Sequence, residues 1–143
     1  ILRIELFMTL LAGFAGGLFG TLWSGLVTMP LLTRWPSLRP DPWRPETASR
    51  VVAGAVLHGA SGAAAGLLFW LSWGLVAVVA APWPALGASF GALVWTAGAL
   101  PAFGVLALRS RGSSGMLALT ALELLVACVA AGLLCAYVWH RAA

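Results

Sequence analysis

Four long apolar segments, separated by short polar or proline-rich stretches, make up most of this chain. They cover residues 5–32, 48–81, 85–108 and 116–138, approximately. A helix of about 20 apolar residues crosses the hydrocarbon core of a bilayer. The pattern therefore predicts an all-α integral membrane bundle of four transmembrane helices, folded as one domain over residues 1–143.

Three local features modify this picture. The second segment is too long for one upright span, so we expect it to tilt or to leave the membrane near Trp70 and Trp73, since tryptophan favours the interface. The third segment contains Pro101, which predicts a kink. Residues 33–47 form a proline- and arginine-rich loop that we expect to be extended, because closely spaced prolines prevent a helix.

Composition agrees with a membrane environment. Hydrophobic residues are 62% of the chain and charged residues only 8%. A soluble domain carries about 25% charged residues, because water must wet its surface. This excludes an ordinary soluble domain and makes membrane lipids the expected surroundings. The arginines lie at the ends of apolar segments and not along one face, so the net charge of +4 does not indicate nucleic-acid binding.

The positions of the arginines also predict how the chain is oriented across the membrane. The loops after the first and third segments fall on one side of the membrane and contain most of the basic residues: Arg34, Arg39, Arg44, Arg50, Arg109 and Arg111. Only Arg3 and Arg141 fall on the other side. By the positive-inside rule both basic loops are cytoplasmic and both termini periplasmic. All eight Lys and Arg residues are arginine, and alanine and glycine are abundant, which is typical of a bacterial protein from a GC-rich genome. With the four spans, this predicts a multi-pass protein of the bacterial inner membrane. No small-residue cleavage site follows the first apolar run, so no cleavable signal peptide is expected.

Small residues recur at four-residue spacing within the predicted helices. The glycines concerned are Gly13, Gly16, Gly17, Gly20, Gly54, Gly62, Gly66, Gly87 and Gly91. Such GxxxG-like faces allow membrane helices to approach closely. We interpret them as helix-packing faces, with hinges or a ligand crevice as the functional alternative.

Two ionisable side chains lie well inside the predicted spans. His58 follows Arg50 by eight residues and Glu123 follows Gly115 by eight residues, so both lie about 12 Å from the side with the basic loops. Pro101 precedes Arg109 by the same spacing, and Ser24 is slightly deeper. The sequence predicts an intramembrane polar layer of Ser24, His58, Glu123 and the backbone carbonyls that Pro101 leaves free.

Three arrangements of this layer remain open. His58 and Glu123 could pair only to satisfy each other and fix helix register. They could form a proton or ion relay, or a substrate site. In the third arrangement they do not meet, and Glu123 contacts another subunit or lies protonated towards lipid.

The sequence contains few residues that could form a haem, metal or disulfide site. Haem between helices needs two histidines at one depth, and His140 lies at the opposite end from His58. One histidine and one glutamate are too few for a structural or catalytic metal site. Cys128 and Cys135 are two helical turns apart, about 10 Å, too far for a disulfide, and we expect small core or lipid-facing residues. No cofactor and no enzymatic activity are expected.

Two function classes follow. The first is a non-catalytic accessory, assembly or anchoring subunit, packed in the bilayer against copies of itself or other membrane subunits. The second is a small oligomeric transporter or channel, proton- or ion-linked, that uses His58 and Glu123. A transporter requires a hydrated route to the polar layer, whereas a packing subunit does not.

Overall fold

Four helices of the computed structural model are long and apolar enough to cross a membrane. The structure describes residues 2–38, 47–72, 81–109 and 114–142. Within these ranges, the potential spans are Ile4–Arg34, Ala48–Leu71, Trp83–Arg109 and Gly115–Arg141. The prediction of an all-α fold with four apolar, membrane-spanning helices is confirmed.

The first span is continuous but not uniform. It consists of α1 (Leu2–Trp23), a five-residue π-helix η1 (Ser24–Thr28) and α2 (Met29–Arg34). Inside η1 the hydrogen bonding is wider than in an α-helix, because the Met29 amide donates to the Ser24 carbonyl. Pro30 follows at once and has no amide hydrogen to continue the regular pattern. The π-helix was not predicted, although Pro30 is a local signal for it.

The helix of the third span is interrupted about one turn before Pro101, and this proline causes the interruption. The span consists of α5 (Trp83–Ala97) and α6 (Ala99–Arg109), which are separated at Gly98. Pro101 cannot donate to the carbonyl four residues before it, and its ring clashes there, so the helix is interrupted at that turn. The kink predicted from Pro101 is therefore present, and it lies at Gly98.

The second and fourth spans differ from their predicted lengths. Helix α3 (Ala48–Leu71) is shorter than predicted and is closed by Ser72, whose amide donates to the Leu68 carbonyl at 2.9 Å. Its 24 residues span about 36 Å, which already crosses the hydrocarbon core. Helix α7 (Ser114–Ala142) is longer than predicted. Trp73 and the rest of 73–80 lie outside the described residues.

The loop after the first span is only partly described. Residues 36–38, expected to be extended, form the short 3₁₀-helix η2 (Pro36–Leu38). Its first residue is a proline, whose fixed backbone angle suits a tight turn. The expectation of extended chain is therefore wrong at this turn, and residues 39–46 lie outside the described part.

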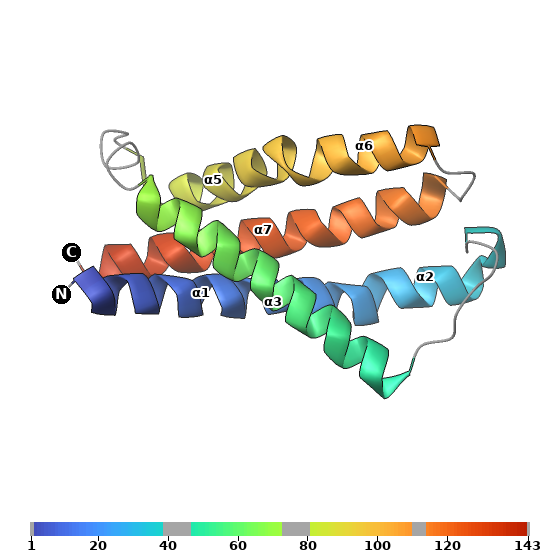
Figure 1. Ribbon diagram of the computed structural model, residues 1–143, viewed down its shortest axis with the longest axis horizontal. Coiled ribbons are helices and arrows are strands. Elements are labelled where there is room, and N and C mark those ends of the chain that lie inside the picture. The colour runs from blue at the N-terminus through green and yellow to red at the C-terminus, as the bar shows by residue number, and fades with distance from the viewer. Residues whose placement is uncertain (1, 39–46, 73–80, 110–113, 143) are drawn as a thin grey trace.

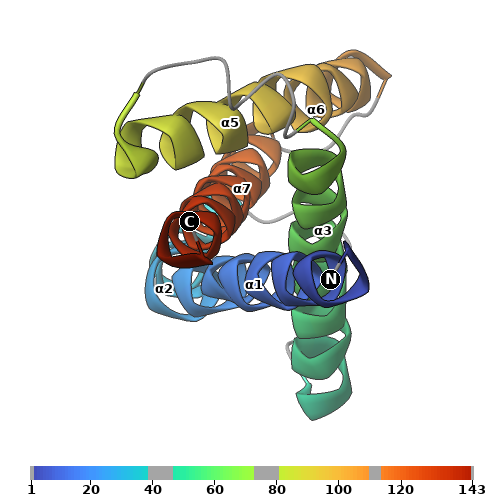
Figure 2. The same ribbon diagram turned by 90° about the vertical axis from the view of Figure 1, so that its left-hand side faces the viewer.

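Helix α1 lies between α3 and α7, and α5 packs on the opposite side of α7 (Figures 1 and 2). The beginning of α1 and the end of α7 lie together at one end of the molecule, called here the terminal end. The other end, where α2, α6 and the start of α3 lie, is called the basic end. Helix α3 runs obliquely, and towards the basic end it diverges from the first span (Figure 1).

Packing is tightest towards the terminal end. Phe69 is fully buried in a cluster with Ala12, Cys135 and Ala136, and its ring meets that of Phe90 edge-on at 5.1 Å. In α6, by contrast, no residue is buried. The molecule is therefore close-packed at one end and loosely packed at the other.

The helix crossings occur at small residues. Gly13 and Gly17 of α1 face the Gly62 and Gly66 backbone of α3, and a β-carbon on Gly62 would collide with the Gly13 carbonyl oxygen. Gly16 and Gly20, on the adjoining face of α1, oppose three alanines of α7: Ala127, Ala130 and Ala131. This close approach brings three helices around one point.

Helices α5 and α7 also approach each other closely at glycines. A β-carbon on Gly87 would lie 2.7 Å from the Gly132 carbonyl oxygen, and one on Gly91 would lie 2.6 Å from the Val129 α-carbon. Gly54 differs from the other glycines of the predicted packing faces, because a β-carbon there would meet no atom within 4 Å. Its expected place on a packing face is corrected, since α3 has already diverged from α1 at this level.

Candidate functional site

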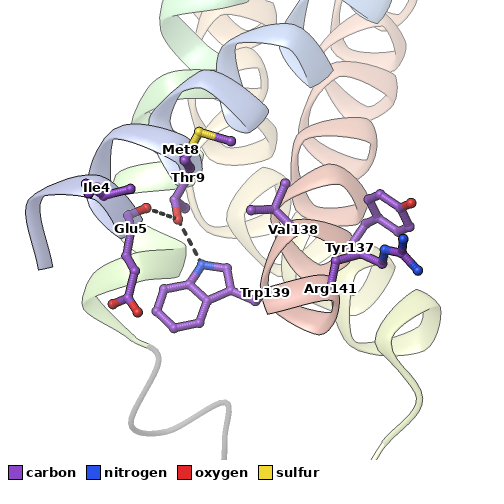
Figure 3. A pocket seen from close by; sticks show the side chains of 8 residues that line it. All are labelled: Ile4, Glu5, Met8, Thr9, Tyr137, Val138, Trp139 and Arg141. Atoms are coloured by element: carbon purple, nitrogen blue, oxygen red, sulfur yellow. Dashed lines mark hydrogen bonds between the residues drawn. The ribbon is translucent and has the colours of Figure 1, made fainter. Parts of the chain in front are cut away.

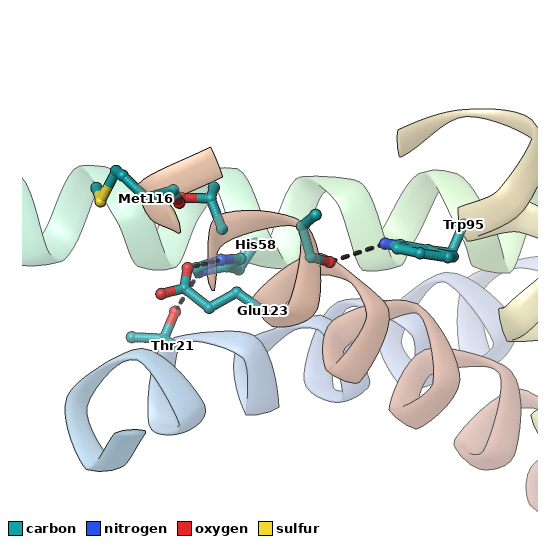
Figure 4. Close-up of polar contacts among 7 residues, drawn as sticks. Thr21, His58, Trp95, Met116 and Glu123 are labelled. Atoms are coloured by element: carbon teal, nitrogen blue, oxygen red, sulfur yellow. Dashed lines mark hydrogen bonds and ion pairs between the residues drawn. The ribbon is translucent and has the colours of Figure 1, made fainter. Parts of the chain in front are cut away.

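The structure brings His58 of α3 and Glu123 of α7 into contact. The imidazole Nε2 and the carboxylate Oε2 are 3.3 Å apart, and the two side chains are 13% and 9% exposed. Figure 4 shows them between the helices. The arrangement in which they do not meet is therefore not the one observed. A buried carboxyl and imidazole that share one proton form a neutral pair, which reduces the cost of placing them in an apolar bundle.

The other imidazole nitrogen is also bonded. Nδ1 of His58 lies 2.9 Å from the Thr21 hydroxyl of α1. The hydroxyls of Thr9, Thr33, Thr96 and Thr120 each donate to a carbonyl one turn earlier in their own helix. The Thr21 hydroxyl instead reaches a different helix, so three helices contribute one side chain each to the chain of contacts Thr21–His58–Glu123 (Figure 4).

Two proton arrangements fit this geometry. In one, Thr21 donates to Nδ1 and the Nε2 hydrogen points to the carboxylate. In the other, Nδ1 donates to the Thr21 oxygen and a protonated Glu123 donates to Nε2. The second arrangement holds one proton more than the first, because Nδ1 gains a proton while Nε2 passes its own to the carboxylate, and only the second pair is neutral. The imidazole is thus placed to pass a proton between its two neighbours.

Helix packing explains why these residues meet. The Gly17 α-carbon lies against the His58 carbonyl, and Gly20 faces the His58 ring and Ala127. One turn beyond Gly17, Thr21 continues the face of α1 that contacts α3. One turn before Ala127, Glu123 continues the face of α7 that contacts α1. The glycine contacts therefore set the register that brings the polar side chains to one level.

A cavity of about 190 Å³ reaches the imidazole from the basic end. It occupies the wedge where α3 diverges from α1, and it is lined by Thr21, Ser24, Gly25, Met29, Arg50, Val51, Gly54 and His58. At Gly25 and Gly54 an added β-carbon would meet nothing within 4 Å, which reflects the open space between the helices. A water occupies about 30 Å³ in the liquid, so the space has room for several, and polar side chains contribute to a lining that is mostly apolar.

Of the other two residues predicted for the polar layer, Ser24 lies at the cavity and Pro101 does not. Ser24 lines the same cavity as His58, at the first residue of η1. Pro101 is exposed on α6 and is not among the residues that line the cavity. Its inclusion in the polar layer is corrected, because the kinked helix places this proline on an outward face.

The predicted basic residues are only partly described. Arg50 lines the cavity, Arg34 lies over the Trp35 ring at 5.2 Å, and Arg109 is exposed at the end of α6. Arg39, Arg44 and Arg111 lie outside the described residues. Cys128 and Cys135 are free and buried, which agrees with the expected absence of a disulfide between them.

Three polar residues near the site were not predicted. Thr21 completes the chain of contacts. Thr28 is only 2% exposed, and its hydroxyl has no hydrogen-bond partner among the described residues. The same is true of the Trp23 indole nitrogen. A buried polar group without a partner is costly, and these two lie at either end of the π-helix, at the last residue of α1 and the last residue of η1.

Replacing Thr21 with valine is expected to destabilise the fold by about 1 kcal/mol, because a similar shape is kept while the hydroxyl bonded to His58 is lost. The matched change is Thr96→Val, whose exposed hydroxyl bonds only within its own helix. That variant should stay within about 0.5 kcal/mol of the parent. Equilibrium unfolding in mixed micelles measures both, and equal effects would show that the Thr21 bond does not stabilise the fold.

Comparison of the chain with protein-family models, with curated proteins and with solved structures finds no match.

Proposed function

We propose that this protein is a small proton-linked membrane transporter in which His58 passes protons between a cavity at the basic end and the buried Glu123. One observation carries the proposal. The imidazole lies between the cavity and Glu123, with Nδ1 next to cavity-lining Thr21 and Nε2 next to the carboxylate. A pair that served only to fix helix register would not need an open cavity against one of its members.

The uneven packing of the bundle supports the same proposal. Beyond Glu123, towards the terminal end, α1, α3 and α7 are closed by glycine and alanine contacts and by the fully buried Phe69. The arrangement corresponds to a transporter that is open towards the basic end and closed towards the other. Alternating access requires a second state in which this packing opens, and the π-helix next to the cavity is a place where helical register can shift.

The lining of the cavity favours an anionic solute. Arg50 supplies a cationic group, Thr21 and Ser24 supply hydroxyls, and no acidic side chain is among the described lining residues. A proton bound at the His58–Glu123 pair would raise the positive charge next to the cavity. A small anion would therefore bind best when the pair is protonated, which couples its movement to the proton.

The arginine distribution supports an orientation with the basic end in the cytoplasm and both termini in the periplasm of a bacterial inner membrane. In that orientation the cavity opens to the cytoplasm.

A second candidate, the accessory or assembly subunit, is favoured by a different observation. Helix α6 has no buried residue, and the α5–α6 span packs mainly on α7. Such a weakly packed span is suited to contact another membrane subunit or another copy of this chain. The two candidates are compatible if transport occurs in an oligomer.

Filling the cavity tests the transporter directly. Gly54→Phe directs a ring into the cavity from a position at which an added β-carbon meets no atom within 4 Å. We expect proton flux into proteoliposomes, followed with an internal pH dye under an imposed pH gradient, to fall about tenfold or more. The thermal unfolding of the variant should match that of the parent.

The control is Gly104→Phe, the same change at an exposed glycine of α6 that also has nothing within 4 Å. It lies outside the cavity and should leave flux unchanged. Parent protein that transports no protons, or a folded Gly54→Phe variant with full flux, would contradict the proposal and favour the assembly role.

A further inference from the structure

The cavity next to His58, at the basic end, is small and is lined mostly by apolar groups. Its volume of about 190 Å³ is below the roughly 300 to 1,000 Å³ of typical sites for drug-sized molecules, so it suits a small solute. Met29 and Val51 contribute apolar side chains to the lining. At Gly25 and Gly54 an added β-carbon would meet no atom within 4 Å, so the space beside them is open. Much of the surface of an occupant must therefore be hydrocarbon.

The charge that this cavity offers to an occupant is a single positive one. Arg50 and His58 are the only ionisable residues of the described lining. The His58 ring is already bonded through both nitrogens, to Thr21 and to Glu123, and the protonated pair with Glu123 adds no net charge. The guanidinium of Arg50 has no ion-pair partner among the described residues, where the one salt bridge joins His58 and Glu123. A monoanion is thus compensated, whereas a dianion would bring a second, uncompensated charge into a mostly apolar space.

The chemistry of arginine favours a carboxylate as the negative group. The planar guanidinium presents paired N–H donors whose spacing matches the two oxygens of a carboxylate, and such bidentate bonds are strong. Along α3, Arg50 precedes His58 by eight residues, which is about 12 Å, and Val51 and Gly54 line the cavity between them. A carboxylate held at Arg50 can therefore extend a short hydrocarbon tail along this apolar wall.

A larger cavity at the terminal end offers a different set of groups (Figure 3). Its volume is about 410 Å³, and it lies between the start of α1 and the end of α7. Its lining includes Arg141, but also the acidic residue Glu5. The Trp139 indole donates to the Thr9 hydroxyl at 2.8 Å, and that hydroxyl donates to the Glu5 carbonyl at 2.7 Å, so these polar groups are already bonded. An arginine accompanied by an acidic residue is less suited to an anion than Arg50 is.

From these observations we infer that the cavity at the basic end binds a short-chain monocarboxylate. The carboxylate is bound by Arg50, and the tail lies against Val51 and Met29 in the open space at Gly54. The inference rests on the proposed function and names its substrate class, because the monocarboxylate is then the anion whose movement is coupled to the proton. Phosphate lacks the hydrocarbon part, and a neutral amide of the same shape lacks the charge.

Saturation-transfer NMR on protein in phosphatidylcholine nanodiscs tests this inference, with empty nanodiscs as the blank. Butyrate is the probe, and acetate, butyramide and inorganic phosphate compete with it at neutral pH. We expect butyrate to bind about tenfold more tightly than acetate, because two further methylene groups are buried. Butyramide and phosphate should each bind at least about tenfold more weakly than butyrate.

Two arginine variants locate the bound carboxylate. Arg50→Gln should weaken butyrate binding at least about tenfold and leave thermal unfolding unchanged, since this side chain is exposed. Arg141→Gln is the matched control, the same substitution at the arginine of the other cavity, and it should leave butyrate binding unchanged. Gly54→Phe directs a ring into the cavity at the basic end and should also abolish butyrate binding.

Butyrate binding that is kept in Arg50→Gln, or lost in Arg141→Gln, would overturn the inference. So would butyramide or phosphate that binds as tightly as butyrate. An anionic phospholipid that is retained by the purified parent, lost in Arg50→Gln and not displaced by butyrate would show that the site holds a lipid headgroup instead.

The measurement needs no pH gradient, so it is separate from the test of transport. Proton flux without butyrate binding would refute the substrate class alone. Saturable, Arg50-dependent butyrate binding without proton flux would support the binding site and refute transport alone.

Discussion

Alanine in place of Gly62 is expected to break the contact between α1 and α3 and to destabilise the protein by about 3 kcal/mol. The added β-carbon would collide with the Gly13 carbonyl oxygen and would lie 2.7 Å from the amide nitrogen and α-carbon of Gly17. All of these are backbone atoms, so no side-chain rotation can relieve the overlap. The helices must separate, and the dispersion contacts along the crossing are lost.

The effect should extend to the site. His58 lies one turn from Gly62 on α3, and its carbonyl packs against Gly17. Separation of the helices would therefore lengthen the bond between His58 and Thr21 as well. Unfolding in mixed micelles measures the stability, and histidine NMR shifts report the environment of the imidazole.

Gly54→Ala is the matched control for this prediction. It is the same substitution on the same helix, and its β-carbon meets no atom within 4 Å. Alanine is a better helix former than glycine, so this variant should be neutral or more stable by about 0.5–1 kcal/mol. Similar stabilities for Gly62→Ala and Gly54→Ala would mean that close backbone approach does not determine the α1–α3 contact.

The sequence predicted the spans and the depth of the ionisable residues better than the details of the site. Span positions follow from hydropathy and length alone, and depth follows from the rise of a helix. His58 and Glu123 were predicted at one level by counting residues from the basic side, and the structure has them in contact. The position of a span and the depth of a residue in it are both properties of a single helix.

Features that depend on two helices were harder to predict. Gly54, Gly62 and Gly66 share one four-residue rhythm, but only the last two approach α1, because α3 crosses at an angle. Sequence periodicity does not contain a crossing angle. The same divergence creates the cavity at His58, which therefore could not be foreseen.

Thr21 was missed for a different reason. Ser24 was selected for its depth, and it also continues the Gly16–Gly20 series, yet Gly13 and Gly17 are continued in the same way by Thr21. The two series lie on adjoining faces of α1, and only the packed structure shows that the second faces His58. Ser24 still reaches the cavity, since the π-helix that begins there alters the direction in which the following side chains point.

The close-packed crossing and the buried pair depend on each other. Close approach at Gly13, Gly17 and Gly62 excludes lipid and water from the terminal side of His58. In that dry environment, Glu123 needs the imidazole as a partner. Divergence of α3 on the other side admits polar groups to the same ring. The ring therefore adjoins the cavity on one side only, which is the asymmetry that the proposed proton transfer requires.

Glu123→Gln is expected to reduce proton flux to the level of protein-free liposomes, a loss of about 100-fold or more. The amide keeps the size of the carboxyl group and can still hydrogen bond to Nε2, but it cannot accept and release the proton. Expression and thermal unfolding should change little. The matched control is Glu46→Gln, the same substitution in the polar segment between α2 and α3, which should retain full flux.

A double-variant cycle separates the relay from a purely structural pair. His58→Gln should lose flux to the same extent as Glu123→Gln, and the double variant should lose no more than either alone, because groups that act in one relay are not additive. A purely structural pair would instead show its coupling in the free energy of unfolding. Folded Glu123→Gln protein that still carries protons would exclude the carboxyl group from the route, while the packing of the four helices would remain as described.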